Sequence, residues 1–153
     1  MKRLCVLALM AAAVCLPGLD TARAGANEVR ARRSSALGEV RKIYVGDMGR
    51  DDEAERFRLL LEEQLSRRGF TVVGRPEEAD AVLTGALSVR VYDEKSEARV
   101  FVRLESQSGA RLWSRDFGHK RFKVNPLSLK EPTRRRAEEV AQALHRDWEK
   151  ATK

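Results

Sequence analysis

Three stretches of alternating apolar and polar residues occupy the middle of the chain. Apolar side chains recur at every second position over residues 81–91, and the same alternation returns over 98–104 and 111–117. A period of two is typical of a strand with one buried face. Polar residues at 92–97 and a glycine-containing turn at 107–109 separate the three stretches. We therefore predict three consecutive antiparallel strands, around which the rest of the chain is organised.

The orientation of the third strand stays open. Leu112 and Trp113 are neighbours, so they cannot both face the core of a regular strand. Asp116 shares the parity of Leu112, and Phe117 shares that of Trp113. Neither orientation therefore separates apolar from polar residues cleanly.

A strand and a helix are predicted before this region. Residues 40–45 predict a first strand that ends at a turn over 46–49. A helix then begins near Asp51 or Asp52, and Glu55 follows Asp52 at capping-box spacing. Its apolar residues form a single stripe made of Ala54, Phe57, Leu60, Leu61 and Leu65. Gly69 is expected to close the helix.

Residues 70–74 predict a short second strand, which a crossover connection makes parallel to the first. After the three antiparallel strands, Phe122 and Val124 suggest a brief edge strand, and Pro132 is expected to begin the last helix. The apolar stripe of that helix is Ala137, Val140, Ala141, Leu144, Trp148 and Ala151. The element order predicts an α+β two-layer sandwich, in which helices cover one face of a mixed sheet of four to five strands.

The first 24 residues resemble a secretory leader. Lys2 and Arg3 precede an apolar run from Leu4 to Leu16, and Ala22-Arg23-Ala24 predicts a cleavage site after Ala24. We therefore divide the chain into a cleaved signal peptide (1–24), a mobile arm (25–39) and a single domain (40–151), and expect a periplasmic or secreted protein.

Both cysteines, Cys5 and Cys15, lie in the leader. Lipid anchoring at Cys15 is disfavoured, because a lipoprotein site needs a small residue immediately before the cysteine and Val14 is bulky. If cleavage follows Ala24, the mature chain has no cysteine, so neither disulfides nor thiol chemistry contribute.

No catalytic arrangement is visible. The acids around the turn at 46–49 would repel a phosphate, and their spacing is not that of a calcium loop, so they are best explained as helix-capping residues. His119 and His145 have no second histidine or cysteine nearby, and no serine has a nucleophile motif around it. We expect no enzyme, no cofactor and no metal site.

Two sets of residues are candidates for binding a partner. Seven lysines and arginines stand between residues 118 and 136 against a single acid, and six of them form the basic patch: Lys120, Arg121, Lys123, Arg134, Arg135 and Arg136. Such runs are commonly no more than solvated faces, and the functional alternative is an acidic partner. If the helices cover one face of the sheet, Arg99, Phe101 and Arg103 lie on the other. Nucleic acid would also suit these residues, but an exported chain seldom meets it.

Three segments resemble one family. Residues 69–73, the Ala-Asp-apolar-apolar-x-Gly pattern at 79–85 and the strand at 109–114 resemble the CsgG-like domains of the bacterial envelope. Those domains include the curli-secretion lipoprotein, the N-terminal domain of the Tol-Pal translocation protein, and lipoprotein activators of penicillin-binding proteins. The resemblance covers residues 40–150 and implies a small α/β domain that binds other envelope proteins without catalysis. Pore formation is disfavoured, because the chain has no spare hairpin segment.

The sequence therefore predicts an exported protein-interaction module of the cell envelope that assists assembly or secretion. A peripheral protein that binds anionic lipid or glycan is the alternative. The partner's identity and the oligomeric state stay open.

Overall fold

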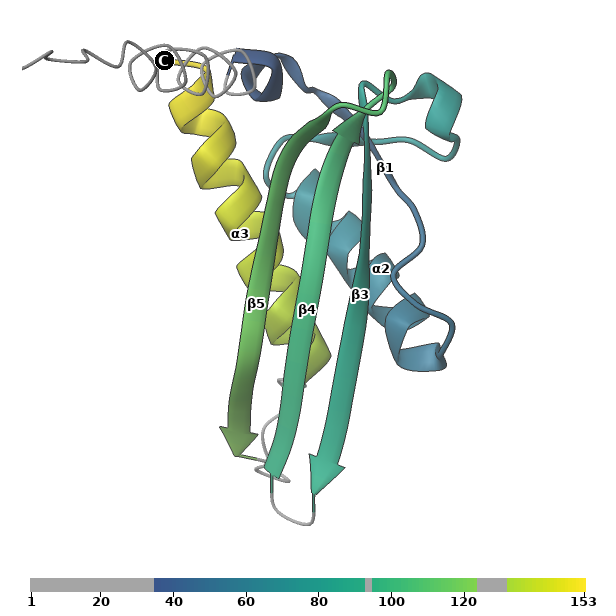
Figure 1. The fold of residues 1–153 in the computed structure, drawn as a ribbon, viewed down its shortest axis with the longest axis vertical. Coiled ribbons are helices and arrows are strands. Elements are labelled where there is room, and N and C mark those ends of the chain that lie inside the picture. Colours follow the sequence, from purple (N-terminus) through teal and green to yellow (C-terminus); the bar gives the residue numbers. More distant parts are fainter. Residues whose placement is uncertain (1–34, 93–94, 124–131) are drawn as a thin grey trace, which may run out of the picture.

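The computed structural model describes residues 35–92, 95–123 and 132–153, with the side chains of 91–97 and 119–123 left aside. One sheet and the helices behind it make up these residues (Figure 1). In chain order the elements are β1 (Lys42–Val45), α2 (Asp52–Ser66), β2 (Thr71–Val72), the short 3₁₀ helix η1 (Pro76–Glu78), β3 (Ala81–Tyr92), β4 (Lys95–Ser106), β5 (Arg111–Lys123) and α3 (Pro132–Ala151).

The sheet is mixed and has five strands in the order β2-β1-β3-β4-β5. β1 runs parallel to β2 and β3, whereas β3, β4 and β5 form an antiparallel meander. α2 and α3 lie behind the sheet, on one face (Figure 1). The predicted α+β two-layer sandwich is therefore confirmed, including the parallel pairing of the first two strands.

The meander strands are longer than predicted. β3 continues to Tyr92 and β4 begins at Lys95, so most of the expected polar connection at 92–97 belongs to strands. β5 continues to Lys123 and includes Phe122, which was expected in a separate strand. Val124 lies outside the described residues. Long paired strands satisfy backbone groups that a polar loop would leave to water, which favours this extension.

The start of α2 follows from a single capping side chain. Asp51 Oδ1 accepts a hydrogen bond from the backbone N–H of Ala54 at 2.7 Å, so Asp51 is the N-cap and the expected Asp52–Glu55 capping box is not formed. Phe57, Leu61 and Leu65 then face the core. Gly69 takes a positive φ of 88° after the helix, as expected for a residue that ends it.

The structure differs from the predicted arm at its last five residues. Residues 35–39 are helical, and Leu37 is only 5 % exposed. The backbone of Gly38 approaches the carbonyl of Ala151, where an added Cβ would lie 2.5 Å from the oxygen. Trp148 Nε1 donates a hydrogen bond to the carbonyl oxygen of Val40 at 2.9 Å. This segment therefore belongs to the folded domain, and the remaining arm residues, 25–34, lie outside the described chain.

The conflict in the third strand is resolved by an irregularity in pairing. Leu104 pairs with Trp113, but the next residue of β4, Glu105, pairs with Arg111, so Leu112 is an extra residue in β5. Trp113 is consequently turned to the helix side, where it is 8 % exposed and its Nε1 donates to Asp147 Oδ2 at 2.9 Å. Leu112 is half-buried.

Candidate binding surface

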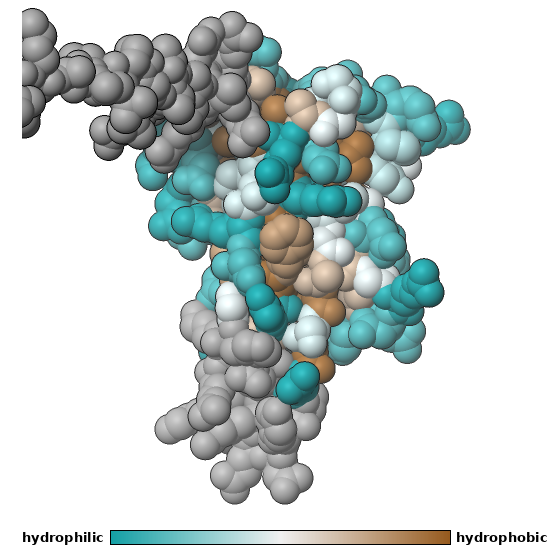
Figure 2. Space-filling model, viewed as in Figure 1, coloured by the Kyte–Doolittle hydropathy of each residue, from teal (hydrophilic) through white to brown (hydrophobic). Residues whose placement is uncertain are grey.

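The face of the sheet opposite the helices carries the predicted residues of β4. Arg99, Phe101 and Arg103 are exposed, while Val100 and Val102 between them are buried against the helices. Phe101 is 43 % exposed, which is unusual for a large apolar side chain in the middle of a sheet. Figure 2 shows this face, on which apolar side chains form a strip between hydrophilic ones. We call this side of the sheet, marked by Arg99, Phe101 and Arg103, the open face.

Arg99 is held by an ion pair across the strands. Its Nη2 lies 2.6 Å from Asp116 Oδ2, and its Nε lies 3.3 Å from Asp116 Oδ1. These hydrogen bonds, and then the charge of Asp116, raise the pKa of Arg99. Both groups are about half exposed, so the pair fixes the position of Arg99 more than it stabilises the fold.

Arg103 is held on the other side of Phe101. Its Nε donates to Thr84 Oγ1 on β3 at 3.1 Å and lies 3.7 Å from Glu105 Oε1. Phe101 thus stands between two arginines that neighbouring strands keep in place. Sequence reasoning missed Thr84, although register predicts such cross-strand partners once the strand pairing is known.

One residue of the predicted basic patch is not on the surface. Arg134 is exposed and Arg135 is half-buried, but Arg136 is 3 % exposed and lies inside the domain. The side chains of Lys120, Arg121 and Lys123 lie outside the described part, although their backbones belong to β5. The patch as predicted therefore cannot include Arg136.

Arg136 links the start of α3 to the sheet. Its Nε and Nη2 donate to the carbonyl oxygen of Ala98 at 3.1 and 2.6 Å, Nη2 also donates to the carbonyl of Gly118, and Nη1 contacts Glu139 Oε2 at 2.7 Å. The β4–β5 pairing shifts between Ala98 and Val100, beside this contact. The sequence carried a signal for the burial of Arg136, because this residue stands four positions before Val140 and so lies on the apolar stripe of α3.

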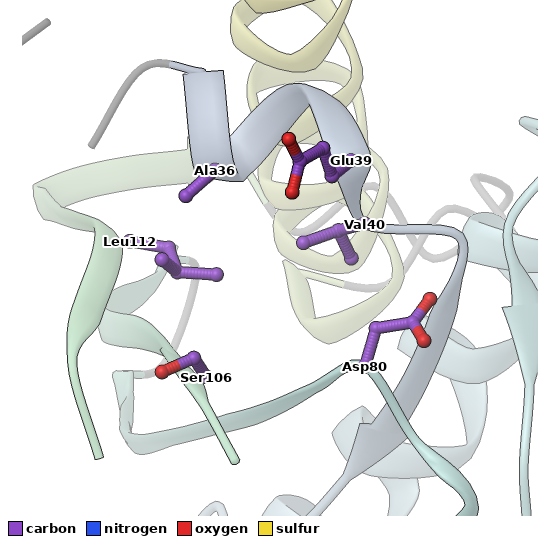
Figure 3. A pocket seen from close by; sticks show the side chains of 6 residues that line it. All are labelled: Ala36, Glu39, Val40, Asp80, Ser106 and Leu112. Atoms are coloured by element: carbon purple, nitrogen blue, oxygen red, sulfur yellow. The ribbon is translucent and has the colours of Figure 1, made fainter. Parts of the chain in front are cut away.

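A hollow of about 380 Å³ lies beside the 35–39 helix. Its side chains come from the 35–39 helix and the residue after it, from the residue before β3 and from the ends of β4 and β5 that flank their turn: Ala36, Glu39, Val40, Asp80, Ser106 and Leu112 (Figure 3). Asp80 Oδ2 accepts hydrogen bonds from the backbone N–H groups of Lys42 at 2.7 Å and Arg41 at 2.8 Å. These bonds lower the pKa of Asp80. The carboxylate therefore joins β1 to β3, which is a structural role.

Asp47 and His145, two further candidates for chemistry, make contacts within the fold. Asp47 Oδ1 accepts from the backbone N–H of Gly49 at 2.8 Å, as a turn-forming carboxylate does. His145 stacks on Trp148 with ring centroids 5.7 Å apart and meets Phe70 edge-on at 6.2 Å. The side chain of His119 lies outside the described residues. Within residues 35–92, 95–123 and 132–153, no three His, Cys, Asp or Glu side chains come close enough to hold a metal ion.

The helices of the described chain are too short or too polar for a membrane span. No protein-family model matches the sequence, and no curated protein matches it either.

Several solved structures are similar to this chain at low sequence identity. PelC from Paraburkholderia phytofirmans, described as a dodecamer, is 19 % identical over 72 % of this chain and 87 % of its own, with a TM-score of 0.46. The lipoprotein GNA1162 from Neisseria meningitidis is 14 % identical over 69 % and 95 %, with a TM-score of 0.44. TolB from Acinetobacter baumannii is 16 % identical over 71 % and 28 %, with a TM-score of 0.43. Bacterial lipoproteins recur among these neighbours, but none singles out the CsgG-like proteins, and likeness at this level assigns no function.

Proposed function

We propose that this protein is a non-catalytic module of the bacterial cell envelope that binds another envelope protein through the open face of its sheet. The observation that carries the proposal is Phe101, which is exposed at the centre of the sheet between Arg99 and Arg103. Aromatic and arginine side chains are enriched where protein interfaces gain most of their binding energy. Two arginines already fixed by Asp116 and Thr84 lose less side-chain entropy on binding.

The expected localisation of the protein is inferred from the leader at residues 1–24. A basic start, an apolar run and a small-x-small site ending at Ala24 support export to the periplasm or beyond it. The CsgG-like resemblance of residues 40–150 supports the same setting and a partner that is itself an envelope protein. Assistance in assembly or secretion is the role we assign to this contact.

The proposal is tested by photo-crosslinking in the living envelope. A photoreactive phenylalanine analogue at position 101 should form an adduct with one envelope protein, while the same analogue at Leu59 should not. Leu59 is a matched control, because it is 53 % exposed on α2, away from the open face. Equal adducts from both positions, or none from position 101, would remove the open face as the binding surface.

A second candidate function is the binding of anionic lipid or glycan by the basic patch without Arg136. The pairing of β4 with β5 supports this candidate, because it brings basic positions together where β5 ends. Lys123 pairs with Lys95, and Arg121 lies two residues before Lys123. Arg134 is exposed at the start of α3. Co-sedimentation with anionic vesicles should then fall when salt is raised and in Arg134→Ser, because such contacts are screened. Salt-independent recovery would exclude it.

A further inference from the structure

A hollow of about 300 Å³ opens on the open face beside Phe101. It is lined by Asp47, Thr84, Gly85, Ala86, Phe101 and Arg103. Ala86 on β3 carries only a methyl group and pairs directly with Phe101 on β4, so both lie on the open face. The space next to the phenyl ring is therefore left by the small side chain of Ala86, and it has the size of a small binding pocket.

Arg103 presents its free end at this hollow. Its Nε is engaged by Thr84 Oγ1 at 3.1 Å and lies 3.7 Å from Glu105. Among the described residues none accepts a hydrogen bond from its two terminal nitrogens. A guanidinium held at one edge offers the other N–H groups as a fork, and a carboxylate fits that fork with two parallel hydrogen bonds.

In the described part of the chain, Arg103 is the cation that remains available at the hollow, and the carboxylates of Asp47 and Glu105 keep their negative charge, so a ligand carboxylate is expected at Arg103 alone. Arg99 is bound to Asp116, so it is not a second free cation. Asp47 uses Oδ1 to accept from its own turn at Gly49. One available guanidinium beside one exposed phenyl ring matches a single carboxylate next to an apolar group, and a sheet of lipid headgroups would need several available cations.

We propose that this hollow binds a short acidic segment of the partner protein, with a carboxylate on Arg103 and a neighbouring apolar side chain on Phe101. The inference rests on the proposed function and adds the chemistry of the partner to it. A peptide of this kind gains charge-assisted hydrogen bonds and apolar contact at one place, which is how linear segments are recognised.

The test is a titration of the ¹⁵N-labelled protein, as processed by the expressing bacterium, followed by NMR. The probe is the acetylated and amidated dipeptide of phenylalanine and glutamate, and the control replaces its glutamate by lysine. The glutamate peptide should shift the amide signals of residues 84–86 and 101–103 in a saturable way. Arg103→Gln should weaken its binding about tenfold, since a charge-assisted pair is lost. Arg56→Gln is the matched control, because Arg56 and Arg103 have equally exposed side chains (51 %) and Arg56 lies on α2; binding should not change there.

Absence of saturable shifts, equal shifts with the lysine peptide, or unchanged binding in Arg103→Gln would overturn the inference. Anionic phospholipid vesicles that perturb the same signals while the peptide does not would overturn it in favour of lipid. The spectrum of each variant shows directly whether it is folded. A protein adduct at position 101 together with failure of the peptide would keep the proposed function and remove only this inference.

Discussion

Arg134 and Arg136 stand two residues apart in α3, yet one is exposed and the other is buried. Both add one charge to the same basic run, so net charge cannot separate them. Their positions on the helix do, because Arg136 lies on the apolar side with Val140 and Arg134 does not. The buried guanidinium is tolerated because backbone carbonyls and Glu139 receive its N–H groups.

Replacing Arg136 by Ala should destabilise the protein by roughly 2–4 kcal/mol, since carbonyl groups at Ala98 and Gly118 lose a buried donor and a cavity remains. Urea unfolding measures the change. Arg134→Ala is the control and should stay within about 0.5 kcal/mol. Equal effects of the two substitutions would contradict the buried position of Arg136.

Asp80 should make a contribution to stability that depends on pH. The N–H groups of Lys42 and Arg41 lower its pKa below the ordinary value of 3.8, so the folded state favours the charged carboxylate. The contribution is present above that value and is lost as the pH falls through the lower pKa of the folded state. The difference in urea midpoint between the protein and Asp80→Ala should therefore be largest near neutral pH and shrink in acid. Glu77→Ala serves as control, and a difference that grows in acid would have the wrong sign.

At the scale of elements, the sequence predicted the five main strands, the two long helices and the parallel or antiparallel direction of most strand pairs, but not the strand register or the 35–39 helix. Alternation placed β3 and β4 correctly, because each follows a strict period of two. In β5 the extra residue Leu112 reverses the phase between Arg111 and Trp113. An irregularity of this kind depends on the neighbouring strand, so the sequence showed the conflict between Leu112 and Trp113 but not how it is resolved. The open-face residues of β4 were predictable from their alternation with buried residues. The position of Ala86 beside Phe101 was not, because it depends on the register between β3 and β4.

The β3–β4 pair should depend on the absence of a side chain at Gly85. A Cβ there would collide with the backbone carbonyl oxygen of Phe101 and approach Met48 Sδ at 3.1 Å. Gly85→Ala should cost about 1–3 kcal/mol of unfolding free energy, because strands must separate or shift to accept it. Gly74→Ala is the matched control, since nothing lies within 4 Å of its added Cβ. Thermal unfolding compares the two, and similar melting temperatures would argue against the close approach.

At the scale of the whole molecule, the two ends of the folded region meet. The 35–39 helix rests against the end of α3, and Val40 accepts a hydrogen bond from Trp148, which is 108 positions further along the chain. Five residues carry too little periodicity to predict a helix, so the sequence indicated an arm. Long-range contact with α3 accounts for the order seen there.

Leu37→Ala should test this contact. The side chain is 5 % exposed within the core, so its truncation should lower stability by roughly 2–4 kcal/mol. Leu59→Ala, at an exposed position, should change it by less than about 0.5 kcal/mol. Chemical denaturation distinguishes the two, and a neutral Leu37→Ala would restore the view of a loose arm.

The two indole groups have a practical consequence. Trp113 donates to Asp147 between β5 and α3, and Trp148 donates to Val40 between α3 and the first helical segment. The chain has no other tryptophan. Replacing either one by phenylalanine leaves a single tryptophan at one of the two junctions. Its fluorescence can be excited apart from that of the tyrosines, so the order in which the junctions open during denaturation can be followed without an added dye.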